Sequence, residues 1–161
     1  MRCVVLAVIL MLSLQTCDGG ARHHSVAGRD PSVQSALNAM RSATTDRLEI
    51  LCVPKHILTR ADLGPDLLEK QYNYRITIRM LHASELQDDL IRALDQPSIR
   101  RAAAQPPDVR WACIFYDTNN TRVLAMYFDG FGRKGLINGT PVTSVGPIVE
   151  VLERRCASLW G

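Results

Sequence analysis

Two segments with strong β-strand character, joined by a short polar turn, constrain the fold more than any other feature of this chain. Residues 109–116 and 122–128 are rich in aromatic and β-branched side chains, and the connection Asp117-Thr-Asn-Asn-Thr121 is typical of a turn. Alternate residues of the first segment are Val109, Trp111, Cys113 and Phe115, which share one face. The pattern predicts a β-hairpin.

Three further segments have the features of strands. Residues 48–53 and 135–139 are short apolar runs bounded by turn residues. In residues 72–79 apolar and polar side chains alternate, so that Arg75 and Arg79 share a face that we expect to be directed to solvent or to a partner.

Two segments predict amphipathic helices. Residues 84–95 begin with Ser84-Glu-Leu-Gln87, which has the form of a capping box with Ser84 as the N-cap. Residues 145–160 place Pro147 in the first turn and carry an apolar stripe at helical spacing: Val145, Ile148, Val149, Leu152, Cys156 and Leu159. We therefore expect an α+β fold, in which an antiparallel sheet of about five strands carries two main helices packed on one face.

The N-terminus has the layout of a secretory signal. Arg2 is followed by the apolar run from Cys3 to Leu14, which is shorter than the ~20 residues that span a bilayer. Small residues at Gly19-Gly20-Ala21 predict cleavage after Ala21. The protein is then exported, and it is periplasmic or secreted.

A second interpretation of the same region remains open. Leu14-Gln-Thr-Cys17 resembles a bacterial lipoprotein box, although Thr16 stands where such boxes usually carry Gly, Ala or Ser. This resemblance implies lipidation of Cys17 and attachment to a membrane through the N-terminus. An uncleaved anchor is a third alternative.

The sequence divides into three parts. Residues 1–21 form the predicted signal peptide, residues 22–46 are polar and small and predict a flexible leader, and residues 47–161 form one α+β domain. Within the leader, Pro31 with Asp30 as cap predicts a short, weak helix over residues 31–41.

Three cysteines remain in the domain once the signal is removed: Cys52, Cys113 and Cys156. In an exported protein this odd number predicts one disulfide and one buried thiol, with Cys156 paired to Cys52 or to Cys113. Three reduced, buried cysteines are the alternative.

Patterns that carry catalysis are weak in this chain. Cys52 and His56 lie four residues apart, but Pro54 interrupts the element between them. We find no spacing typical of a zinc site, and the glycines of residues 129–135 join two strands rather than a strand and a helix, as a phosphate-binding loop would require. The sequence predicts no enzyme activity, no metal and no cofactor.

The candidate binding residues are Phe131, Arg133, Arg75 and Arg79. Phe131 lies between two glycines and close to Arg133, and it is either an exposed interface anchor or a core plug. The net charge of +3, without a basic stripe interleaved with aromatic residues, argues against nucleic acid.

These features predict a small exported, non-catalytic protein-binding module, such as a periplasmic inhibitor or immunity-type antagonist. Its partner would be another exported or envelope protein. The alternative is a cell-envelope lipoprotein with a structural or assembly role. A hydrolase is the third hypothesis, and it requires a pocket that joins His56 or His82 to Asp62 or Asp129.

Overall fold

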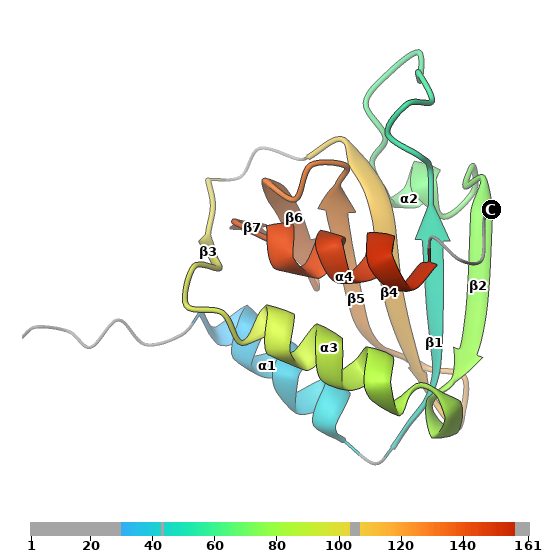
Figure 1. Ribbon diagram of the computed structural model, residues 1–161, viewed down its shortest axis with the longest axis vertical. Coiled ribbons are helices and arrows are strands. Elements are labelled where there is room, and N and C mark those ends of the chain that lie inside the picture. Colours follow the sequence, from blue (N-terminus) through green and yellow to red (C-terminus); the bar gives the residue numbers. More distant parts are fainter. Residues whose placement is uncertain (1–29, 43, 104–106, 157–161) are drawn as a thin grey trace, which may run out of the picture.

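An antiparallel β-sheet forms the centre of the fold (Figure 1). The computed structural model describes residues 30–42, 44–103 and 107–156. Its strands are β1 (Thr45–Cys52), β2 (Tyr74–Arg79), β3 (Arg100–Arg101), β4 (Val109–Asp117), β5 (Arg122–Asp129), β6 (Lys134–Ile137) and β7 (Thr140–Thr143). Within the described residues these seven strands are ordered β2-β1-β4-β5-β6-β7-β3.

Helices lie on both sides of this sheet. They are α1 (Pro31–Arg41), α2 (Pro65–Leu68), α3 (Ser84–Leu94) and α4 (Gly146–Cys156), with a 3₁₀ turn, η1, at Met80–His82. The longer helices α1, α3 and α4 cover one face, as Figure 1 shows, whereas α2 packs against the other. None of the helices in the described part of the chain is long and apolar enough to cross a membrane.

The expected α+β class with an antiparallel sheet is confirmed, but the sequence predicted too few strands and too few helices. The sheet has seven strands rather than about five, and three eleven-residue helices rather than two cover its main apolar face. The missed strands are short: β3 has two residues and β7 has four, including Pro141. Such lengths leave too little alternation to be detected in a sequence.

Helix α1 belongs to the core, so the folded part begins before residue 47. The Asp30 carboxylate caps it as expected, accepting a hydrogen bond from the backbone N–H of Ser32 at 2.8 Å. Its buried residues follow helical spacing: Val33, Ala36, Leu37 and Met40. Residues 31–41 are therefore a packed helix and not part of a flexible leader.

The start of α3 also differs from the sequence prediction. Ser84 is the first helical residue, and the N-cap is Ala83, which makes no capping hydrogen bond through its side chain. The side chain of Gln87 instead donates to the main-chain carbonyl of Met40, at the end of α1. The predicted capping-box glutamine thus links two helices.

The predicted hairpin is formed by β4 and β5. Trp111, Cys113 and Phe115 face the helices as expected, but Val109 packs on the opposite side of the sheet. The register shifts between Val109 and Trp111, and this irregularity reverses the direction of the first side chain.

The second face of the sheet is only partly covered. The chain between β1 and β2, which contains α2, buries a smaller apolar cluster that includes Leu51, Leu63 and Leu68. The Glu69 carboxylate holds this segment on the sheet by accepting from the Tyr127 hydroxyl and pairing with Arg122 at 2.6 Å. The rest of the face is polar, and Arg75 and Arg79 are exposed there, as the alternation predicted.

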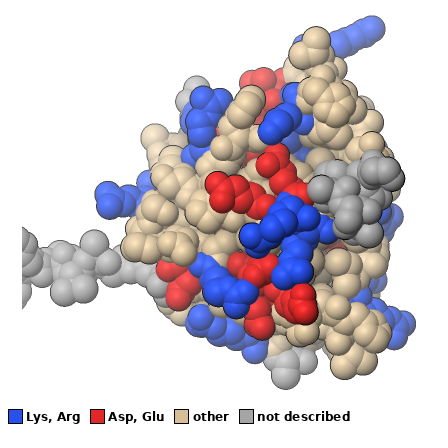
Figure 2. Space-filling view, viewed as in Figure 1, with Lys and Arg blue, Asp and Glu red and all other residues tan. Residues whose placement is uncertain are grey.

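One buried carboxylate joins α3 to α4. Asp89 of α3 is 8% exposed, and its Oδ2 accepts from Nε of Arg155 of α4 at 2.8 Å. Arg92 and Arg154 also pair with it, and Figure 2 shows the resulting mixture of basic and acidic side chains over this side of the molecule. Hydrogen bonds from Arg155 and Arg92 lower the pKa of Asp89 below its ordinary value.

We predict that Asp89 makes part of the stability dependent on acid. Because folding lowers the pKa of Asp89, this carboxyl binds a proton in the unfolded chain at a higher pH than in the folded protein. The contribution of Asp89 to the free energy of unfolding is therefore complete above the pKa of the unfolded chain, about 3.9, and is lost as the pH falls below that value. Urea unfolding at about pH 6 and about pH 3 should show a smaller acid-induced loss for Asp89→Asn than for the wild type.

Asp88→Asn is the matched control, because Asp88 is the exposed neighbour on the same helix. It should behave like the wild type. If the acid-induced loss of the free energy of unfolding is equal in the wild type and in Asp89→Asn, Asp89 is not the source of the acid dependence.

Candidate functional site

A single carboxylate organises the turn from Asp129 to Lys134, which joins β5 to β6. Its Oδ1 accepts hydrogen bonds from the backbone N–H groups of Phe131 at 3.1 Å and Arg133 at 2.9 Å. Its Oδ2 accepts a third from the backbone N–H of Lys134 at 3.1 Å. Because aspartate side chains stabilise turns by accepting from nearby main-chain groups, these three bonds fix the path of the turn.

The turn also packs closely on the structure around it. Gly132 has a φ of +66°, and a Cβ added there would lie 2.4 Å from Cα of Gly146, the first residue of α4. A Cβ on Gly130 would lie 3.2 Å from Cβ of Lys55 and 3.3 Å from Cγ of Arg110. Glycine is therefore needed at 132, and the turn is held between α4, β4 and the chain that follows β1.

Phe131 lies at the exposed side of this turn. Its side chain is 67% exposed, and the guanidinium carbon of Arg133 lies 4.9 Å from the centre of its ring. This distance is typical of a cation–π contact. The interpretation of Phe131 as a core plug is therefore wrong, and the exposed aromatic–arginine pair is the geometry expected of an anchor.

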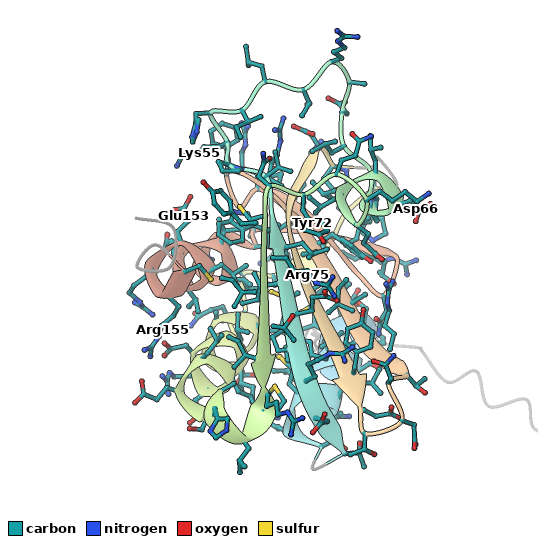
Figure 3. The ribbon with its side chains drawn as sticks, turned by 90° about the vertical axis from the view of Figure 1, so that its right-hand side faces the viewer. Lys55, Asp66, Tyr72, Arg75, Glu153 and Arg155 are labelled. Atoms are coloured by element: carbon teal, nitrogen blue, oxygen red, sulfur yellow. The ribbon has the colours of Figure 1, made fainter. Side chains whose placement is uncertain are left out.

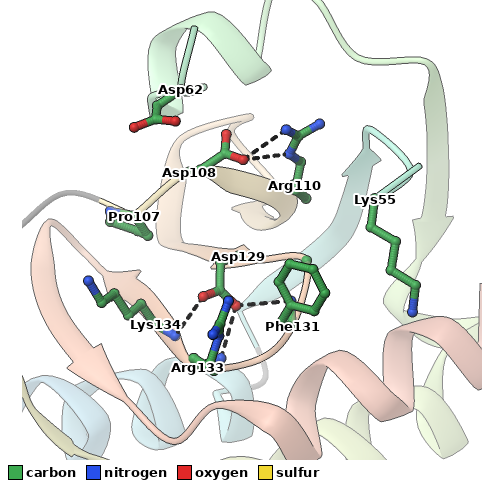
Figure 4. Close-up of a pocket in the computed structure, with 10 residues that line it drawn as sticks. Lys55, Asp62, Pro107, Asp108, Arg110, Asp129, Phe131, Arg133 and Lys134 are labelled. Carbon is green, nitrogen blue, oxygen red and sulfur yellow. Dashed lines mark hydrogen bonds and ion pairs between the residues drawn. The ribbon is translucent and has the colours of Figure 1, made fainter. Parts of the chain in front are cut away.

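A cavity of about 430 Å³ opens beside Phe131 (Figure 4). The segments that border it come from the β1–α2 connection, the start of β4 and the β5–β6 turn. The residues that line it are Lys55, Asp62, Pro107, Asp108, Arg110, Asp129, Gly130, Phe131, Arg133 and Lys134.

Arg110 and Asp108 form the inner wall of the cavity. Nε and Nη2 of Arg110 donate to the same oxygen of Asp108, at 2.9 and 2.8 Å. Nη1 of Arg110 donates to the main-chain carbonyl of Ile57 at 2.8 Å, and Asp108 accepts from the backbone N–H of Leu63 at the same distance. These bonds fasten the β1–α2 connection to β4, so the Arg110–Asp108 pair supports the site.

Charged side chains make up most of the lining of the cavity. Four basic and three acidic side chains line the cavity, so its formal charge is 4 − 3 = +1. Asp62 and Asp129 both line it, but neither His56 nor His82 is among its lining residues, so this cavity does not join a histidine to either carboxylate as the hydrolase hypothesis requires. Lys55 and Arg133 are both exposed at the cavity. Lys55 pairs with Glu153 at 3.4 Å, and Arg133 lies against the Phe131 ring.

The structure does not bring Arg75 and Arg79 to this turn. Both lie on β2, which is separated from β5 by β1 and β4, and strands are spaced about 4.8 Å apart. Arg75 pairs with the buried carboxylate of Glu49, to which the Tyr116 hydroxyl also donates at 3.1 Å. The four predicted binding residues therefore form two surfaces, not one.

The cysteines are buried, and the predicted disulfide is not formed. Cys52, Cys113 and Cys156 are free thiols. Burial raises the pKa of Cys52 to about 12 and that of Cys156 to about 11, and burial also raises the pKa of Cys113. All three belong to the buried cluster between the sheet and its helices, so the helix that carries Cys156 packs on the sheet that carries the other two, as expected from the sequence. Cys17, the possible lipidation site, lies outside the described residues.

These pKa values argue against a thiol nucleophile at Cys52, because the reactive thiolate is not populated near neutral pH when the pKa is about 12. In the described residues there is also no group of three or more His, Cys, Asp or Glu side chains that could hold a metal ion.

Comparison of the chain with protein-family models, with curated proteins and with solved structures found no match.

The exposed residues of the site, Phe131 and Arg133, could be predicted from the sequence, but the residues that support them could not. Lys55, Asp62 and Arg110 come from segments far from residue 131, and no local pattern relates them to the turn. A detectable signal was present at Asp129, because an aspartate before Gly-Phe-Gly is suited to an Asx-type turn.

We predict that Asp129→Ala releases the turn. Loss of a carboxylate that satisfies three main-chain donors should destabilise the protein by about 1–3 kcal/mol, measured by urea unfolding. Hydrogen exchange at the amides of Phe131, Arg133 and Lys134 should accelerate.

Asp117→Ala provides a matched control in another hairpin turn, where Asp117 accepts from the backbone N–H groups of Asn119 and Thr121. It should leave exchange in the 129–134 turn unchanged. If Asp129→Ala also leaves that exchange unchanged, the carboxylate does not hold the turn.

Proposed function

We propose that this protein is a small exported, non-catalytic binding module that docks onto another exported or envelope protein through the Phe131 turn. In this proposal it acts as an inhibitor or immunity-type antagonist. The observation that carries the proposal is a hydrogen-bonded turn that exposes 67% of an aromatic side chain beside Arg133 and an open cavity.

The geometry supports docking for an energetic reason. Binding usually costs free energy because side chains and loops must become ordered at the interface. Here three hydrogen bonds to Asp129 and the close approach of Gly132 to Gly146 already fix the turn in the free protein. An exposed phenylalanine on such a turn buries apolar surface on binding with little further loss of entropy.

The surroundings of Phe131 support a protein partner rather than a small apolar ligand. Small-molecule pockets are mostly apolar and enclosed, whereas this cavity is lined mainly by charged side chains. An aromatic anchor with an arginine and a polar rim is the composition typical of an interface hot spot.

The raised pKa values of the thiols support the non-catalytic part of the proposal, and so does the lining of the cavity, which includes neither His56 nor His82. Export is supported by the layout of residues 1–21, with the predicted cleavage after Ala21. The alternative, a lipoprotein of the cell envelope, depends on Leu14-Gln-Thr-Cys17, and the intact mass of the mature protein distinguishes the two.

We predict that Phe131→Ala removes partner binding without unfolding the protein. Because the side chain is mostly exposed, the free energy of unfolding should change by no more than about 0.5 kcal/mol. Loss of a hot-spot aromatic should weaken capture of the partner by at least about tenfold. The measurement is quantitative capture from the exported fraction of the source cells, with mass-spectrometric identification of the captured protein.

Leu81→Ala is the matched control, because Leu81 is 86% exposed but lies in η1, away from the turn. It should retain capture. Equal capture by Phe131→Ala and Leu81→Ala, or marked destabilisation by Phe131→Ala, would contradict the proposal.

A further inference from the structure

Strand β2 lies at one edge of the sheet. It pairs with β1 on one side, and no other described strand lies beyond it. Figures 1 and 3 show β2 as the outermost strand, and in Figure 3 it runs along the side turned to the viewer. An edge strand of this kind presents main-chain groups that an additional strand can pair with.

The uncovered part of the adjoining sheet face is basic. On this face β1 and β2 carry three arginines and one glutamate, with a formal charge of 3 − 1 = +2: Arg47, Arg75, Arg79 and Glu49. Arg75 pairs with Glu49, so this carboxylate is already used by an arginine of the same face.

The other two arginines oppose each other. Arg47 of β1 and Arg79 of β2 are direct cross-strand partners, and no ion pair joins either of them to a carboxylate of the described residues. Arg47 instead donates to the Asn120 side chain and lies 4.3 Å from the centre of the Tyr116 ring. Like charges in directly opposed positions are destabilising, so a carboxylate brought to this edge would relieve an existing repulsion.

We propose that the β2 edge receives an extended acidic segment of a partner protein as an additional strand, with its carboxylates beside Arg79 and Arg47. This inference extends the proposed binding function to a second surface. Because Phe131 takes no part in it, failure of this inference and failure of the Phe131 site can be told apart.

The alternation of side chains along β2 indicates which residues the added strand should carry on each face. Arg75, Thr77 and Arg79 lie on the open face, whereas Ile76 and Ile78 pack against the helix-side core. Side chains that lie opposite each other in a sheet share a face, so the partner strand should alternate acidic and apolar residues.

A second copy of this chain does not fit the same edge. Antiparallel pairing of two β2 strands about Thr77 would place Arg75 of each copy opposite Arg79 of the other. Such pairing would add a second basic face beside the first, which makes self-association unfavourable.

The test uses the full-length mature protein and a fluorescent peptide of about eight residues that alternates Glu and Val, with an alternating Lys and Val peptide as its counterpart. Fluorescence anisotropy should show at least about fivefold tighter binding of the Glu peptide, and added salt should weaken it. Hydrogen exchange should slow at the β2 amides when the Glu peptide binds.

Arg79→Glu should remove the preference for the Glu peptide, and because Arg79 is exposed the variant should fold normally. Arg133 and Phe131 lie in the β5–β6 turn and not at the β2 edge. The variants Arg133→Glu and Phe131→Ala should therefore bind the Glu peptide like the wild type.

Several outcomes would overturn the inference. Absence of Glu-peptide binding, equal binding of both peptides, or an unchanged preference in Arg79→Glu would exclude acidic recognition at this edge. Binding without protection of the β2 amides would exclude strand addition. Sedimentation of the free protein as a dimer that Arg79→Glu dissociates would assign the edge to a second copy.

Discussion

The three hydrogen bonds from main-chain N–H groups to the Asp129 carboxylate are the interaction on which the proposed site depends. They fix the β5–β6 turn. This turn exposes Phe131 and Arg133 and forms one side of the cavity. Gly132 makes this arrangement specific, because only a residue without a Cβ can lie against Gly146 at the start of α4. Helix α4 therefore helps to position the β5–β6 turn that carries Phe131.

The way the sheet is covered explains why two separate surfaces are exposed. Helices α1, α3 and α4 pack on one face and bury the main core with it. The Asp89–Arg155 ion pair joins α3 to α4. On the other face, α2 and its flanking chain cover only part, and they are held there by Glu69. The edge strand β2 and its arginines remain outside this cover. One sheet thus offers an aromatic turn at the β5–β6 connection and a basic edge at β2.

Much of the fold could be predicted from local patterns, and the failures have physical reasons. The hairpin of β4 and β5, the alternation of Arg75 and Arg79 with apolar residues, and the apolar stripe of α4 are strong periodic signals, and the structure contains all three elements. Helix α1 was underestimated because its own sequence is polar and small, and its order comes from burying Leu37 and Met40 against the sheet. The cavity could not be predicted, because Lys55, Arg110 and Phe131 meet only through the sheet order. Gln87 illustrates the same limit, since its partner at Met40 is fixed by helix packing and not by the capping box.

The central claim is that the Phe131 turn is already rigid in the free protein, and backbone ¹⁵N relaxation tests it most directly. The account predicts order parameters of about 0.85 for the amides of residues 130–134, equal to those of the neighbouring strands β5 and β6. Values below about 0.6 for Phe131 and Arg133, with rigid strands on either side, would contradict it. In that case the exposed phenylalanine would belong to a mobile loop and not to a preformed anchor.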